Sequence, residues 1–233
     1  MVMKLKKTNK LWKKAEKVIP GGNGLLSKRP DRYAPDIWPT YFKTCSGVNV
    51  TALNDKKYID MAQMGIGSSI LGYANDELSD YVNSIIKGGV NCTLNSLEEV
   101  SFAEKLLELN PFAGGVKFAK TGAEAMSIAI RIARAYTGKV KVLFSGYHGW
   151  TDWYLAANIK SSKSLDNHLL PGLEPTGVPP GLANTVIPFK YDDIEDFERV
   201  YSKNKDCGII CIEGARYDYP DKKFLKKIMS VAK

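Results

Sequence analysis

Three short stretches place chemically useful side chains directly after apolar runs. The first, FAKTGAEA, passes through Thr121, Gly122 and Ala123 into a helical pattern. Backbone N–H groups at such a helix start, aided by the helix dipole, form a seat for phosphate. Gly122 permits close approach of a ligand to the backbone, and the Thr121 hydroxyl adds a donor. Many strand–glycine–helix turns bind nothing, so this stretch alone leaves both interpretations open.

The second stretch, FSGYHGWTDW, holds one of only two histidines in the chain. Its glycines allow a tight turn, and Tyr147, Trp150 and Trp153 are expected to present flat ring faces that stack on a planar ligand. His148 can exchange hydrogen bonds or titrate near neutral pH. A histidine satisfied within an aromatic cluster is the alternative. The spacing shows no Ser–His–acid arrangement, so a hydrolytic triad is set aside.

The third stretch, IICIEGAR, ends an apolar run at Glu213. This carboxylate is expected to orient His148, to bind a ligand hydroxyl, or to pair with Arg216. Ligands of α/β proteins bind beyond the carboxyl ends of the parallel strands. The three strand ends together therefore predict a pocket for a flat ring that carries a phosphate.

The elements around these stretches indicate an α/β fold with a largely parallel sheet, because strand and helix patterns alternate. Helices are predicted at an N-terminal amphipathic segment around residues 11–19 and at 76–87, 96–110, 123–137, 191–204 and 221–233. A hairpin is predicted at 53–60, and strands are predicted at 114–121, 139–146 and 207–214, the last of them buried. A long loop is predicted at about 158–183. Ile128, Ile132 and Ala135 are expected to lie on one face of the helix at 123–137, and Gly138 is expected to end it. Only three strands follow Gly115, so the sheet is expected to be incomplete.

Composition fits a globular protein that works in the cytoplasm. Of the 233 residues, 44% are hydrophobic and 25% charged, and no apolar run approaches the ~20 residues that cross a bilayer. The basic N-terminus lacks the continuous apolar stretch of a secretory signal. A net charge of +8 comes from scattered lysines, without a nucleic-acid-binding motif. We expect no membrane or nucleic-acid partner.

The four cysteines indicate reduced thiols. Cys45, Cys92, Cys207 and Cys211 form neither a CxxC pair nor a metal-ligand cluster with the histidines. The CGIIC spacing lies in an apolar run and is expected to place Cys207 and Cys211, both buried, on one face of a strand. No metal site is predicted.

Several motifs in order give the chain a family resemblance. These are IPGG, SKRPDRYAP, LND with KYIDM, GIGSSILGYANDEL, FAKTGAEAMSIAIRIARAYTGK, GYHGWTDW and YDD. The chain resembles the class III pyridoxal-phosphate-dependent aminotransferases, especially the glutamate-1-semialdehyde aminomutase-like branch. The resemblance implies a fold type I enzyme, a homodimer and pyridoxal 5'-phosphate as cofactor. It implies that residues 1–60 contribute to a small domain and the substrate entrance, and that 61–233 form an incomplete cofactor-binding large domain.

The resemblance also implies roles for individual residues. The cofactor-binding positions are Thr121, Gly122 and Ala123 at the phosphate, Tyr147 stacked on the pyridine ring, His148 beside it, and Glu213 close to the cofactor. Lys28 and Arg29, on the loop 27–32, are the candidates for meeting a substrate carboxylate. Two positions depart from the family pattern: Ala123 lacks a hydroxyl found in many members, and Gly214 replaces a proline.

The family's aspartate that pairs with the pyridine nitrogen, and its Schiff-base lysine, would both fall beyond Lys233. No catalytic residue is therefore assigned, and the chain is expected to be the N-terminal half of an aminotransferase or aminomutase, inactive alone. The expected substrate is a small amino-group donor or acceptor. The alternative is a non-catalytic chain that binds the cofactor or another phosphate ligand, or that serves dimerisation.

Overall fold

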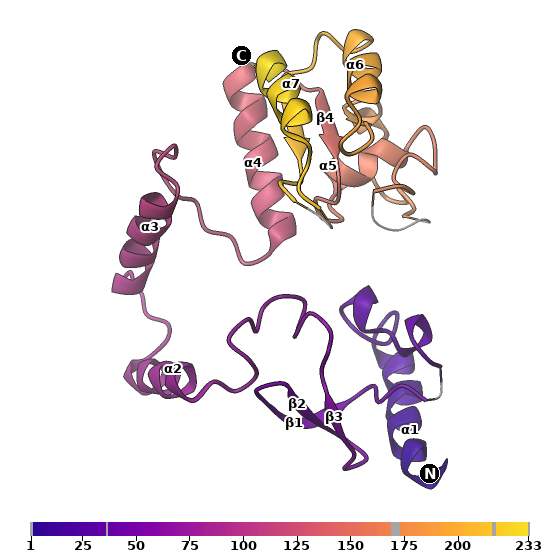
Figure 1. Ribbon diagram of the computed structural model, residues 1–233, viewed down its shortest axis with the longest axis vertical. Coiled ribbons are helices and arrows are strands. Elements are labelled where there is room, and N and C mark those ends of the chain that lie inside the picture. Colours follow the sequence, from indigo (N-terminus) through magenta and orange to yellow (C-terminus); the bar gives the residue numbers. More distant parts are fainter. Residues whose placement is uncertain (1, 36, 169–172, 216–217, 233) are drawn as a thin grey trace. The chain divides into compact units, whose positions relative to one another are not determined.

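The computed structural model describes residues 2–35, 37–168, 173–215 and 218–232. It divides the chain into two compact units, Met1–Ser96 and Leu97–Lys233, and each is described here by itself (Figure 1). The predicted division at residue 60 concerns the domains of a complete enzyme and stays a prediction.

The first unit combines helices with a small antiparallel sheet. Its elements are α1 (Val2–Val18), two 3-10 turns (Leu26–Lys28 and Pro30–Arg32), β1 (Phe42–Ser46), β2 (Asn49–Ala52), β3 (Lys57–Ile59) and α2 (Asp76–Gly88). The sheet order is β1-β2-β3. The predicted hairpin is confirmed: β2 and β3 pair antiparallel, and Asp55 takes a positive φ of 67° in the turn between them. The α2 helix begins after Asn75, whose side chain accepts the N–H of Leu78.

The second unit is an α/β unit with a parallel sheet, as predicted. Its elements are α3 (Leu97–Leu109), α4 (Gly122–Thr137), β4 (Val142–Ser145), α5 (Asp152–Leu155), β5 (Val186–Pro188), α6 (Ile194–Ser202), β6 (Ile209–Ile212) and α7 (Lys222–Ala232), with 3-10 turns at Ala156–Asn158 and Pro180–Leu182. The strand order is β5-β4-β6, with both pairings parallel. The carboxyl ends of all three strands therefore meet at one edge.

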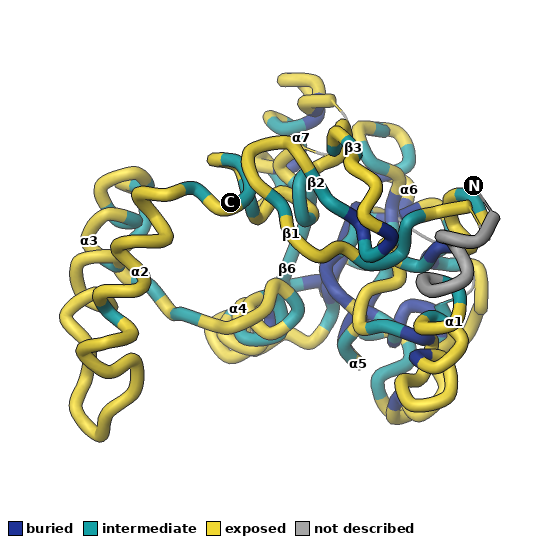
Figure 2. Tube along the Cα trace, turned by 90° about the horizontal axis from the view of Figure 1, so that it is seen from below, coloured by how far each residue is buried: buried dark blue, intermediate teal, exposed yellow. Residues whose placement is uncertain are grey.

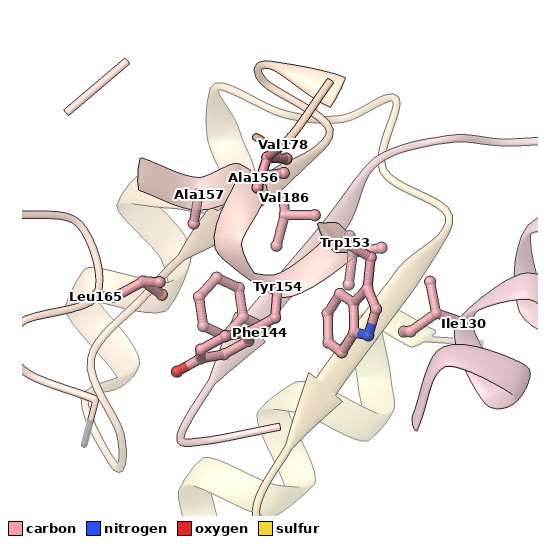
Figure 3. Close-up of a cluster of buried hydrophobic side chains, with 10 residues drawn as sticks. Ile130, Phe144, Trp153, Tyr154, Ala156, Ala157, Leu165, Val178 and Val186 are labelled. Carbon is pink, nitrogen blue, oxygen red and sulfur yellow. The ribbon is translucent and has the colours of Figure 1, made fainter. Parts of the chain in front are cut away.

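The core of this unit lies on both faces of β4. Val142 and Phe144 point into a cluster with Trp153 and Tyr154 of α5 (Figure 3). Leu143 points the other way, into a cluster with Phe197 of α6. All four residues of β4 are buried, which is typical of a central parallel strand covered on both faces. In Figure 2 buried residues gather near α5, whereas α2 and α3 contain no buried residue.

Helix α4 has well-defined ends. Thr121 accepts the N–H of Glu124, whose carboxylate accepts the N–H of Thr121 in return, forming a capping box. Gly138 ends the helix in the left-handed conformation. The apolar face marked by Ile132 is not the one that packs in the core: Ile130 is buried at 3% exposure, while Ile132 is 58% exposed. The helix turns its Ile130 side toward Trp153.

The strand predictions need three corrections. No strand forms at 114–121, where the chain is irregular without a pairing partner, and a strand without ladder hydrogen bonds is not stable. The strand β5 was not predicted, and it lies shortly after the long loop. Finally, β6 is half-buried along its length, because it has a neighbour on one side only.

The cysteine prediction is half confirmed. All four thiols are free, as expected. Cys207 precedes β6 and packs in the Leu143 cluster, whereas Cys211 packs against the Phe144 cluster. The two thiols therefore lie on opposite sides of the sheet, and Cys211 is only half-buried. None of the helices in the described part of the chain is long and apolar enough to cross a membrane.

Candidate functional site

The three stretches predicted to form a site come together at the carboxyl edge of the parallel sheet. Gly149, in the turn after β4, lies so close to the first turn of α4 that a Cβ on it would be 2.9 Å from the Cβ of Ala123. Gly146, directly after β4, approaches the residue after β6 in the same way, since a Cβ there would lie 2.5 Å from Cγ of Glu213. Both glycines have φ of +100°, which other residues rarely adopt. These two close approaches join all three stretches.

The start of α4 presents backbone N–H groups that the helix itself does not use. The N–H of Glu124 is satisfied by Thr121, while those of Gly122 and Ala123 lie in the first helical turn, which offers no internal acceptor. A Cβ at Gly122 would meet no atom within 4 Å, so there is open space beside these N–H groups. The Thr121 oxygen accepts the capping hydrogen bond, which leaves its proton available for an anion.

The aromatic turn presents fewer ring faces than predicted. Tyr147 is half-buried and meets Tyr154 edge to face at 5.7 Å between ring centroids; burial raises the pKa of its phenol. Trp150 is exposed. The prediction for Trp153 is wrong: it is 6% exposed and packs between Tyr154 and Ile130 in the core, where it cannot stack on a ligand (Figure 3).

His148 is a buried, neutral histidine. Its Nε2 lies 3.0 Å from the carbonyl oxygen of Ser145 and 3.6 Å from Sγ of Cys211. Burial lowers the pKa of His148, opposed by the Ser145 carbonyl and the negative charge of Glu213. Because a carbonyl only accepts, Nε2 carries the proton and Nδ1 is an acceptor. Burial also raises the pKa of Cys211 to about 11, so this thiol stays protonated.

Sequence reasoning missed the residues that hold the aromatic turn. The N–H of Gly146 donates to Nδ1 of His168 at 3.1 Å, and the Tyr154 hydroxyl donates to the Gly146 carbonyl at 3.0 Å. His168 gave no signal in the sequence, since it lies within the predicted loop far from any strand. The position of Tyr154, directly after Trp153 in the aromatic run, was a signal that could have been used.

A hydroxyl pair joins the same turn to α4. Ser127 donates to the Ala123 carbonyl at 2.9 Å and lies 3.0 Å from Oγ1 of Thr151. Since Ser127 uses its only proton on that carbonyl, Thr151 donates to Ser127. This contact reinforces the approach of Gly149 to Ala123.

The two predicted substrate residues belong to the other unit. Lys28 is exposed at the end of the first 3-10 turn, and Arg29 pairs with Asp31 through two hydrogen bonds of 3.0 and 3.1 Å. Their role toward a substrate stays a prediction. Arg216, the alternative partner of Glu213, lies outside the described residues.

Comparison with known proteins places this geometry in a family. Residues 33–209 match the family model of class-III aminotransferases. The chain belongs to the class-III aminotransferase family. It is 32% identical to 3-aminobutyryl-CoA aminotransferase of Cloacimonas acidaminovorans, over 99% of this chain and 53% of that protein. It is also 32% identical to glutamate-1-semialdehyde 2,1-aminomutase of Methanopyrus kandleri, over 93% of this chain and 49% of that protein.

Solved structures agree with this assignment. A transaminase solved with PLP bound matches with a TM-score of 0.81 and 25% identity, over 97% of this aminotransferase chain and 52% of the solved one. The predicted fold type I architecture is thus confirmed for the part present. The chain spans about half the length of the curated relatives it matches.

Family membership and the bound cofactor of the solved neighbour indicate pyridoxal 5'-phosphate as the cofactor of this family member. The residues present fit it. The open space beside the Gly122 N–H suits the phosphate, and Tyr147 supplies a ring at the adjacent turn. The close approaches of Gly146 and Gly149 leave room for no larger side chain in the turn that would carry the ring.

Proposed function

We propose that this chain supplies the cofactor-binding part of an enzyme that moves an amino group on a small substrate, as an aminotransferase or an aminomutase. The convergence of the start of α4 with the ends of β4 and β6 at one sheet edge, fixed by the Gly149–Ala123 and Gly146–Glu213 approaches, is the observation that carries the proposal. Both reaction types occur among the named relatives.

In this proposal each named residue binds the cofactor or orients it. The N–H groups of Gly122 and Ala123 and the Thr121 hydroxyl hold the phosphate, because oriented backbone donors at a helix start need no reorganisation. Tyr147 covers one face of the ring and excludes water from it. When bound, pyridoxal 5'-phosphate supplies the electron-withdrawing ring on which amino-group chemistry depends.

His148 and Glu213 complete the polar side of the proposed site. With its proton on Nε2 and directed at Ser145, His148 offers Nδ1 as a hydrogen-bond acceptor beside the ring. Glu213, next to Gly146, is proposed to accept a hydrogen bond from a donor on the cofactor or substrate. Lys28 and Arg29 are proposed to meet a substrate carboxylate, and the working enzyme is proposed to be a cytoplasmic homodimer.

The test measures binding of pyridoxamine 5'-phosphate, which has no aldehyde and so forms no adducts with the many lysines of the chain. Gly122→Pro removes one N–H from the seat while keeping the helix, because proline is well tolerated at the first helical position and Thr121 already has extended φ and ψ of −133° and 155°. Asp76→Pro makes the same change at the start of α2 and serves as the matched control.

Fluorescence titration should show pyridoxamine 5'-phosphate binding at least about tenfold tighter than pyridoxamine, since charge-assisted hydrogen bonds contribute about 1.5–3 kcal/mol. Gly122→Pro should remove most of this difference, and Asp76→Pro should leave it intact. Equal affinity of the Gly122→Pro variant and the unmodified chain for pyridoxamine 5'-phosphate would refute the proposed phosphate seat.

A further inference from the structure

The second histidine of the chain is buried against the turn after β4, although it comes from a distant loop. His168 is 6% exposed, and its ring lies 5.1 Å from the Phe144 ring between centroids. Its Nδ1 is 3.1 Å from the backbone nitrogen of Gly146. A loop with no regular secondary structure thus delivers one polar atom to one backbone group at the proposed site.

The chemistry of this contact fixes the state of the ring. A backbone N–H can only donate, so Nδ1 of His168 must be the acceptor and cannot carry a proton. The ring in this arrangement is therefore neutral and protonated on Nε2. The contact is specific to the Nδ1 position, which lies one bond closer to the backbone than Nε2.

Gly146 needs such a contact more than most residues. Glycine adopts positive and negative φ about equally well, so its φ of +100° is not fixed by its own geometry. Two hydrogen bonds hold Gly146 in this conformation. His168 accepts one from the Gly146 N–H, and the Tyr154 hydroxyl donates one to the Gly146 carbonyl. A rotation at Gly146 would swing the next residue, Tyr147, and would also change the space that Glu213 occupies.

We propose that His168 is a positioning residue: by accepting the Gly146 N–H at Nδ1 it holds the turn so that Tyr147 faces the cofactor ring. This inference rests on the proposed function for the role of Tyr147. The effect on Gly146 itself does not require a ligand, and the two parts can be measured separately.

The test uses two substitutions whose side chains carry the same amide group at different distances from the backbone. In His168→Asn the side-chain oxygen takes the place of Nδ1 and can still accept the Gly146 N–H, whereas in His168→Gln the oxygen sits near the position of Nε2. His168→Ala removes the acceptor altogether. Val200→Ala, in the core cluster on the opposite face of the sheet, is the control that shows how far a general loss of stability lowers the measured protection and affinity.

Hydrogen exchange of the Gly146 amide, followed by NMR on the whole chain without ligand, tests the positioning. We expect protection close to that of the unmodified chain in His168→Asn and Val200→Ala, and protection reduced about tenfold or more in His168→Gln and His168→Ala. Equal Gly146 protection in the Asn and Gln variants would overturn the proposal, as would a Gln variant that is protected as well as the unmodified chain.

Affinity for pyridoxamine 5'-phosphate tests the link to the cofactor. His168→Asn should bind within about threefold of the unmodified chain, and His168→Gln about five- to tenfold more weakly, the ratio expected for one net hydrogen bond. Equal affinities of the two variants would overturn the link. If the unmodified chain itself does not bind, the proposed function fails, and the amide exchange alone then decides whether His168 controls Gly146.

Discussion

Substituting Gly149 by alanine tests the contact that joins the aromatic turn to the phosphate seat. Two costs arise. The backbone at φ +100° is strained for any residue with a Cβ, which costs about 1–3 kcal/mol. The new methyl would also lie 2.9 Å from Cβ and 3.0 Å from Cα of Ala123, and because Cα belongs to the helix backbone, the turn itself must move, for about another 1–3 kcal/mol.

Two companion variants separate these costs. Gly138→Ala, at the other end of α4, also introduces a Cβ at positive φ, here 65°, but meets no atom within 4 Å, so it measures backbone strain alone. Ala123→Gly combined with Gly149→Ala removes one of the clashing methyl groups. Urea unfolding should show Gly149→Ala more destabilising than Gly138→Ala by about 1–3 kcal/mol, and the double variant should recover part of that difference.

The same variants should change cofactor affinity in the same order, because the displaced turn carries Tyr147 away from the seat. Gly149→Ala should weaken pyridoxamine 5'-phosphate binding about tenfold or more, and Gly138→Ala should not. If Gly149→Ala destabilises the protein no more than Gly138→Ala, and Ala123→Gly gives no recovery, the turn is not packed against α4 as described.

Three further predictions concern side chains of the same region. Ser127→Ala and Thr151→Val should each lower the free energy of unfolding by about 1 kcal/mol, and the double variant should cost less than their sum because they share one hydrogen bond; exact additivity in urea unfolding would contradict the pair. Cys211 should resist alkylation at pH 8, since burial raises its pKa to about 11, while exposed Cys92 should react; mass spectrometry showing equal labelling would contradict this. Burial lowers the pKa of His148 in the folded state, so the unfolded chain takes up its proton first, and the free energy of unfolding should fall as the pH drops below about 6.5. This fall should be smaller in His148→Gln, and an unchanged pH profile would contradict the buried neutral ring.

Local sequence signals predicted the order of the helices and the three stretches that meet at the sheet edge. The Thr121–Glu124 spacing marks the start of α4 and Gly138 its end, both through backbone chemistry that adjacent residues decide. The features that sequence patterns did not predict depend on tertiary contacts. The segment 114–121 has the composition of a strand, yet without a neighbouring strand it forms none.

Side-chain direction was harder to predict than element position. Trp153 lies three residues after the exposed Trp150, but α5 directs it into the Phe144 cluster. Ile130, and not Ile132, faces the core because the rotation of α4 is set by the sheet and α5 and not by its own apolar pattern. The contact of His168 with Gly146 joins residues 22 positions apart through an irregular loop, which no periodic pattern encodes.

The most direct test of the account is an amide-resolved NMR titration of the chain with pyridoxamine 5'-phosphate. We expect the amide signals of Gly122 and Ala123 and the ring signals of Tyr147 to shift together, with one dissociation constant, because one ligand contacts both the seat and the turn. Shifts confined to the lysine-rich helix α1, or shifts of the seat without Tyr147, would contradict a single cofactor site at this edge of the sheet.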